Sequence, residues 1–164
     1  MKILGKNSFL ALFIRGASIT SLAIAASTVA ISAQAATMTE GLVQGYAAAM
    51  KSAANSKNIN QVANLVSDDA LISLSRKGKS TSLDKDAYLK LLQKSWNEAS
   101  NYNYDIDISN IVITGSQAKA NVNTVESWVK DGKRVSFVTN SRTTLTLSTG
   151  NAVLLRAVSQ VTID

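Results

Sequence analysis

Carboxylates and tyrosines are the residues of this chain that could carry chemistry. The 164-residue sequence contains no His and no Cys. This excludes Ser-His-Asp and Cys-His nucleophilic catalysis, an imidazole general base, and ordinary zinc or copper sites. The acidic pairs Asp68-Asp69 and Asp105-x-Asp107 lack the Asx-rich loop that an EF-hand calcium site requires. The sequence therefore predicts neither a metal site nor a cofactor.

Glu126 is the carboxylate with the clearest pattern around it. Small and apolar residues alternate with polar ones from Ala118 to Val122, and the same alternation puts Glu126 and Trp128 on the inward face of a strand. A carboxylate among apolar inward positions is costly to bury unless it is paired or protonated. We therefore regard Glu126 as the candidate catalytic residue. The alternatives are a solvated position near a hairpin end and a bulge that turns the side chain outward.

Aromatic residues could complete a pocket around this carboxylate. Tyr104 has the inward parity of Ile106 and Ile108, and could donate a hydrogen bond beside Glu126. Apolar pockets with a few polar groups are the usual form of a small-molecule site. The predicted ligand-binding residues are Tyr46, Tyr88, Trp96, Tyr104, Glu126 and Trp128. For Tyr88 and Trp96, plain core packing is the alternative, as is usual for aromatics on an apolar helix face.

Helices are expected to come first in the folded chain and to position the helical members of this set. Apolar spacing predicts helices over 39–55 and 83–99, a short helix starting at Asn58, and a short strand over 70–75. Thr37 or Thr39 could cap the first helix, and Ser82 is the expected cap of the third. Residues 76–80 read as a loop.

Four long strands are expected to follow, over 102–114, 117–130, 133–148 and 152–163. The Asp131-Gly132 pair is a strong hairpin signal, because both residues tolerate positive φ. In the strand over 102–114, Ile111 and Ile113 change the parity set by Ile106 and Ile108, which predicts a bulge. The predicted fold class is α+β. A bent antiparallel sheet packs on three N-terminal helices and forms a cone with a cavity at its wide end.

This order of elements resembles the nuclear transport factor 2-like, or ketosteroid isomerase-like, superfamily, in particular its exported bacterial members. The local features that agree are the strand and hairpin over 126–133, Arg142-Thr143-Thr144, and the final-strand run Arg156-Ala157-Val158-Ser159. The resemblance covers essentially all of residues 36–164 and implies a cone-shaped α+β domain. It implies no catalytic residue, because no catalytic motif of the superfamily matches this chain residue by residue.

Residues 1–35 read as a cleaved signal peptide. A basic start with Lys2, Lys6 and Arg15 precedes the uncharged run from Gly16 to Ile31, and Ser32-Ala33-Gln34-Ala35 has the Ala-x-Ala form that signal peptidases cut. We expect export to the bacterial periplasm or the cell exterior, with no stable membrane anchor after cleavage. An uncleaved anchor is the alternative, although Arg15 interrupts the apolar stretch.

The charge balance argues against nucleic-acid binding. Of the 17 Lys and Arg residues, three lie in the predicted signal, which leaves 14 against 11 Asp and Glu. The basic clusters over 76–79 and 130–134 fall at turns, where solvated charge is the simplest interpretation. No basic stripe with interleaved aromatics is present, so we expect no nucleic-acid partner.

Two functions remain open. The first is a non-catalytic module that binds a small apolar or amphipathic ligand in the cone, or a protein partner on the sheet. Polar outward positions such as Asn140, Thr144 and Thr146 would allow a homodimer through the sheet face. The second, implied by the resemblance, is a ketosteroid isomerase-like or SnoaL-like enzyme. Its general base would be Glu126 and its hydrogen-bond donor Tyr104 or Tyr46.

Overall fold

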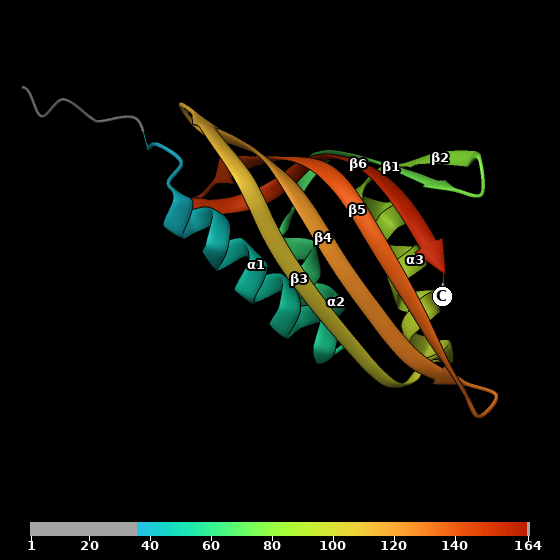
Figure 1. Ribbon diagram of the computed structural model, residues 1–164. Helices are drawn as coiled ribbons and strands as arrows, with labels where there is room; N and C mark the ends of the chain where they lie inside the picture. Colours follow the sequence, from blue (N-terminus) through green and yellow to red (C-terminus); the bar gives the residue numbers. More distant parts are fainter. Residues whose placement is uncertain (1–35, 164) are drawn as a thin grey trace, which may run out of the picture. The chain divides into compact units, whose positions relative to one another are not determined.

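A strongly bent six-stranded sheet is the main feature of the computed structural model, which describes residues 36–163 (Figure 1). The strands are β1 (Val66–Arg76), β2 (Lys79–Leu83), β3 (Ser100–Thr114), β4 (Gln117–Lys130), β5 (Lys133–Ser148) and β6 (Asn151–Ile163). Their order across the sheet is β2-β1-β6-β5-β4-β3. The predicted signal peptide lies outside the described residues. Within residues 36–163, no helix has the length and apolar character needed to cross a membrane.

The meander β3 to β6 is antiparallel throughout, as the sequence predicts, but β1 joins β6 in parallel. A parallel neighbour requires a crossover connection, and α3 with the meander provides it. The predicted α+β class and bent sheet are confirmed, and the complete sheet is mixed rather than wholly antiparallel.

Helices α1 (Glu40–Asn55), α2 (Ile59–Asn64) and α3 (Lys85–Glu98) lie on the concave side of the sheet (Figure 1). Each begins at a side-chain oxygen that accepts from a first-turn N–H group. Thr39 Oγ1 bonds to Leu42 N at 3.2 Å and Asn58 Oδ1 to Gln61 N at 3.1 Å. These bonds satisfy N–H groups that have no partner inside the helix.

Two sequence predictions near α3 are wrong. The helix starts at Lys85 and is capped by Asp84, whose Oδ1 accepts from Ala87 N at 2.8 Å, rather than by Ser82. The expected loop over 76–80 is instead a hairpin with its turn at Lys77-Gly78. The physical reason is shared: Ser82 and Leu83 are used in the β2 ladder opposite β1, so the helix begins later.

Bulges produce the bend of the sheet. The β3–β4 register shifts between Ser109 and Val112, and Asn110 has φ of 52°. This confirms the bulge expected from the parity change in that strand. A second register shift lies in β6, opposite Thr144 and Leu145. It changes the parity of the strand, so that Leu154 points inward before the shift and Ala157 after it. The curved sheet closes over α1, and the core between them includes Val43, Met50, Ile72, Val122 and Leu145.

Candidate functional site

A cavity of about 350 Å³ lies between the concave face of the sheet and the helices α1 and α3. Its volume is within the range of about 300–1,000 Å³ for small-molecule sites. The exposed lining residues Arg76, Leu91 and Ser95 mark its mouth. Every aromatic residue between positions 36 and 164 lines this cavity: Tyr46, Tyr88, Trp96, Tyr102, Tyr104, Trp128 and Phe137.

All six residues predicted to bind a ligand are among the lining residues. The strand parity places Tyr104, Glu126 and Trp128 inward, and α1 and α3 contribute the other three. Their role in binding stays a prediction. The sequence reasoning did not include Tyr102, Phe137 and Arg76. Tyr102 has the same parity as Tyr104, so that signal was present, whereas Arg76 was assigned to a loop.

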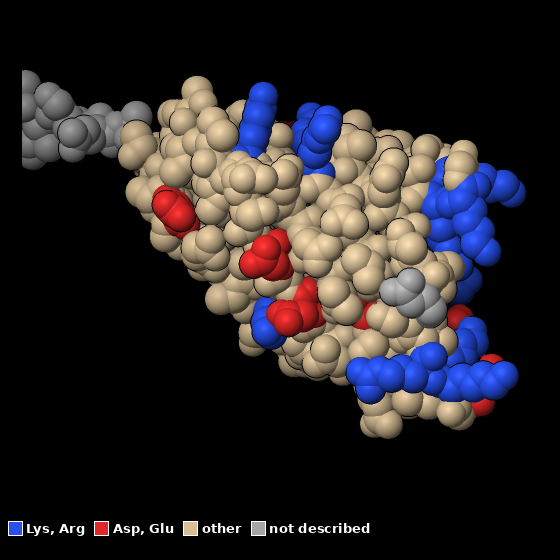
Figure 2. All heavy atoms as spheres, viewed as in Figure 1, with Lys and Arg blue, Asp and Glu red and all other residues tan. Residues whose placement is uncertain are grey.

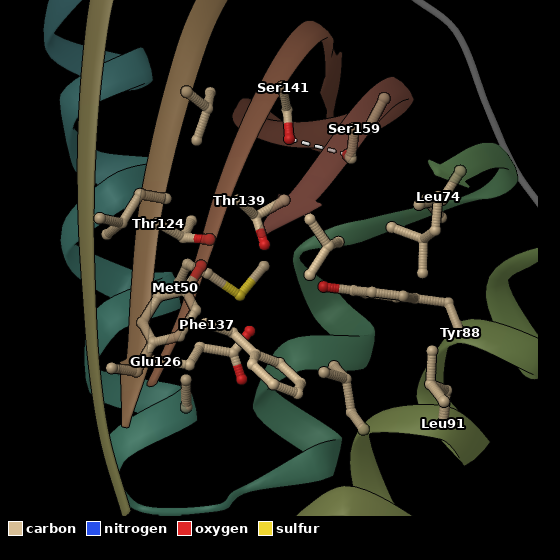
Figure 3. Close-up of a pocket in the computed structure, with 18 of the residues that line it drawn as sticks. Met50, Leu74, Tyr88, Leu91, Thr124, Glu126, Phe137, Thr139, Ser141 and Ser159 are labelled. Atoms are coloured by element: carbon tan, nitrogen blue, oxygen red, sulfur yellow. Dashed lines mark hydrogen bonds between the residues drawn. The ribbon is translucent and has the colours of Figure 1, made fainter. Parts of the chain in front are cut away.

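Glu126 projects its carboxyl group into the cavity beside Phe137 (Figure 3). The Tyr102 hydroxyl donates a hydrogen bond to Glu126 Oε2 at 2.8 Å. Burial raises the pKa of this carboxyl above its ordinary value, and the bond from Tyr102 only partly opposes that effect. Glu126 is therefore partly buried and directed into the cavity, rather than exposed near the hairpin end or turned outward by a bulge, which were the alternatives from the sequence.

Three further tyrosines keep their hydroxyls protonated. Burial is the main cause that raises the pKa of Tyr46, Tyr88 and Tyr104 above the ordinary phenol value. None of these hydroxyls has a hydrogen-bond partner among the described residues, and that of Tyr88 points to the middle of the cavity (Figure 3). They are available to donate to a ligand oxygen.

A chain of aromatic contacts crosses the cavity toward the mouth. The ring of Tyr102 lies 6.0 Å from Trp96 and 6.5 Å from Trp128, measured between centroids. Trp128 meets Phe137 edge to face at 4.7 Å. Such pairs stabilise the fold beyond the area they bury. The buried Trp96 Nε1 has no hydrogen-bond partner among the described residues.

A row of hydroxyl side chains on β4, β5 and β6 continues the same sheet wall beyond Glu126 and Phe137. Thr124 and Thr139 face the cavity, and Ser141 Oγ lies 2.7 Å from Ser159 Oγ (Figure 3). This wall can exchange hydrogen bonds with polar substituents of a ligand. Glu126 is the sole carboxylate among the lining residues. Within residues 36–163, no cluster of three or more His, Cys, Asp or Glu is arranged to hold a metal ion.

Solved structures share this architecture at low sequence identity. A conserved protein from Planctomyces limnophilus superposes with a TM-score of 0.66 at 14% identity, covering 76% of this chain and 97% of that one. A ketosteroid isomerase-like protein from Erwinia carotovora atroseptica gives 0.57 at 17% identity, over 74% and 94% of the two chains. An NTF-2 like protein of unknown function from Silicibacter pomeroyi gives 0.54 at 13%, over 74% and 94%.

No family model and no curated protein sequence matches the chain. The structural similarity nevertheless defines its class: the chain has the nuclear transport factor 2-like, or ketosteroid isomerase-like, fold. The resemblance described from the sequence is thus confirmed at the level of the fold. Proteins with one fold carry unrelated activities, so function has to be argued from the site.

Proposed function

We propose that this chain is an exported, non-catalytic module that holds a small apolar or amphipathic molecule in its cone. The observation that carries the proposal is the concentration of all seven aromatic side chains of residues 36–163 around one cavity. Export rests on the signal-like composition of residues 1–35. The single carboxylate and the tyrosine hydroxyls would orient the polar part of the ligand.

Native mass spectrometry of residues 36–164, purified from an exporting bacterial host, tests this proposal. A small molecule that co-purifies with the protein, or that is taken up from a panel of apolar compounds, would support it. A protein that stays empty against such a panel would contradict it. Intact mass of the exported protein checks the cleavage after Ala35; retention of residues 1–35 would contradict the predicted processing.

A matched pair of variants locates the ligand. Thr124 lines the cavity, whereas its neighbour Val125 is 37% exposed on the outer face. Thr124→Phe should fill the cavity and abolish uptake, and Val125→Phe should leave uptake unchanged, because the two added rings lie on opposite faces of β4. Equal uptake by both variants would place the ligand elsewhere.

We also propose a homodimer through the outer face of the sheet. This face carries a shallow concave area with Asn121, Asn123, Asn140, Arg142 and Gln160, and Asn123 Nδ2 donates to Asn140 Oδ1 at 2.8 Å. Val158 is 64% exposed within it and offers apolar contact. Size-exclusion chromatography with light scattering tests the dimer. A monomer at high concentration would remove it, and Val158→Lys should shift a dimer toward monomer.

The second candidate function is an isomerase-like or SnoaL-like enzyme, and the position of Glu126 favours it. A carboxyl whose pKa is raised by an apolar cavity can act as a general base, and Tyr104 or Tyr88 could donate to the developing enolate oxygen. Glu126→Gln removes the base and keeps the hydrogen bond from Tyr102. Turnover of an identified substrate should fall by about 100-fold or more. Unchanged turnover would end this assignment.

A further inference from the structure

We propose that the cavity selects an amphipathic anion, with the apolar body of the ligand inside the cone and its carboxylate at the mouth beside Arg76. This inference rests on the proposed binding function and adds the charge and orientation of the ligand. The proposed ligand is a monocarboxylate with a single medium-length chain or ring system.

Arg76 is the cation in the cavity wall. It ends β1, and its guanidinium carbon lies 5.1 Å from the centroid of the Phe137 ring. The planar guanidinium thereby lies over an apolar surface at the mouth. Among the described residues, no carboxylate forms an ion pair with it. A guanidinium in this position can bind a carboxylate through two parallel hydrogen bonds.

The rim around Arg76 is also basic. The β1–β2 hairpin contributes Lys77 and Lys79, and the β4–β5 hairpin contributes Lys133. In the same hairpin, Lys130 is paired with Glu98 Oε2 at 3.4 Å, and Arg134 donates to Ser127 Oγ at 2.8 Å on the outer face. Figure 2 shows Lys and Arg side chains gathered at the end of the molecule where these hairpins lie. Six of the 14 basic residues in 36–164 thus lie in the segments 76–79 and 130–134, which contain one acidic residue, Asp131; Glu98 of α3 pairs with one of the six, Lys130.

The single carboxylate of the lining does not cancel this field. Glu126 lies inside the cavity beside Phe137 and accepts a hydrogen bond from Tyr102, whereas Arg76 lies over the same ring and is exposed at the mouth. The exposed guanidinium, rather than the buried carboxyl, is therefore the group that the head of an amphipathic anion would meet at the mouth. Its apolar end would enter toward Met50 and Val122, and its head would remain in partial contact with water.

Three probes of equal chain length separate charge from apolar burial: decanoate, decanol and decyltrimethylammonium. The two tryptophans of the chain, Trp96 and Trp128, both line the cavity, so their fluorescence reports binding. Titrations at about pH 8, where the probe carboxylate is ionised, should give the lowest Kd for decanoate. Raising the salt concentration should narrow its advantage over decanol, since the rim charges are screened.

Arg76→Gln tests the assigned residue, and Lys119→Gln is its charge-matched control on the outer face of β4. Arg76→Gln should weaken decanoate by about five- to tenfold and leave decanol unchanged. Lys119→Gln should leave both Kd values at the wild-type level. Loss of decanoate and decanol together in Arg76→Gln would show a packing role and overturn the inference.

The outcomes distinguish this inference from the proposed function. Equal Kd values for decanoate and decanol in the wild-type protein would overturn the anion selectivity and leave the binding function standing. Tightest binding of decyltrimethylammonium would also overturn it, and would assign selection to Glu126 and the aromatic rings. Failure of all three probes to bind would remove the binding function as well.

Discussion

The side chain of Asn55 forms two hydrogen bonds with the backbone of Tyr104. Asn55 Nδ2 donates to Tyr104 O at 2.8 Å, and Tyr104 N donates to Asn55 Oδ1 at 2.8 Å. Strand β3 is an edge of the sheet, so the amide takes the place that a neighbouring strand would occupy. It also fixes the distance between the end of α1 and the strand that carries Tyr102 and Tyr104.

Asn55→Ala should destabilise the protein by about 1–3 kcal/mol, because two backbone groups of the edge strand lose their partner. Asn103→Ala is the control, since Asn103 is exposed on the same strand and its loss should stay within about 0.5 kcal/mol. Urea unfolding followed by circular dichroism measures both. Equal free energies of unfolding for the two variants would show that the Asn55 amide does not stabilise β3.

Glu126 should make stability depend on pH in a defined direction. Burial raises its pKa in the folded protein, so the folded state holds the proton more tightly than the unfolded state. Stability is then fully present below the unfolded pKa of about 4.3 and declines as pH rises through the folded pKa. Glu126→Gln cannot ionise and still accepts from Tyr102, so it should escape this decline.

Thermal unfolding from about pH 4 to about pH 8 measures this effect. The Tm difference between Glu126→Gln and the wild-type protein should move in favour of the variant as pH rises. Asp107→Asn, at an exposed position of β3 without an ion pair among the described residues, is the control, and its Tm difference from the wild-type protein should not change with pH in this way. If the Tm of Glu126→Gln instead fell relative to that of the wild-type protein as pH rises, the raised pKa of the Glu126 carboxyl would be contradicted.

Lys57 stabilises the end of the helix that carries Trp96. Its Nζ donates to Trp96 O at 3.0 Å and to Ala99 O at 2.6 Å, and a cation at a helix C-terminus is favourable. Lys57→Met should cost about 1–2 kcal/mol. The φ of 51° at position 57 is similarly unfavourable for Lys and for Met, so the backbone does not contribute to the difference. Lys90→Met on the exposed face of α3 should stay within about 0.5 kcal/mol. Comparable losses for the two variants would exclude a specific capping role.

One substitution should have opposite effects at two glycines. An added Cβ would meet nothing within 4 Å at Gly45 or Gly132, but Gly132 has φ of 73°. Gly132→Ala should therefore destabilise the β4–β5 hairpin by about 1–2 kcal/mol, whereas Gly45→Ala inside α1 should stabilise by about 0.5–1 kcal/mol. Differential scanning calorimetry measures both Tm values. A shift of the same sign in both would refute the backbone argument.

The meander and much of its inward face could be predicted from the sequence, because both depend on local signals. Glu126 and Phe137 are equally distant from the Asp131-Gly132 turn and are directly paired across β4 and β5. A two-residue turn fixes that register, and the alternation of side chains then decides which of them point inward. The local sequence around the hairpin therefore determines which sheet residues lie next to Glu126.

Only the tertiary structure decided what closes the cavity and where its charge lies. The parallel pairing of β1 with β6 joins segments far apart in the sequence, and it brings Arg76 over Phe137. It also brings α3 across the concave face with Tyr88 and Trp96. No local preference specifies such contacts, since they arise when the bent sheet and the helices bury their apolar surfaces together.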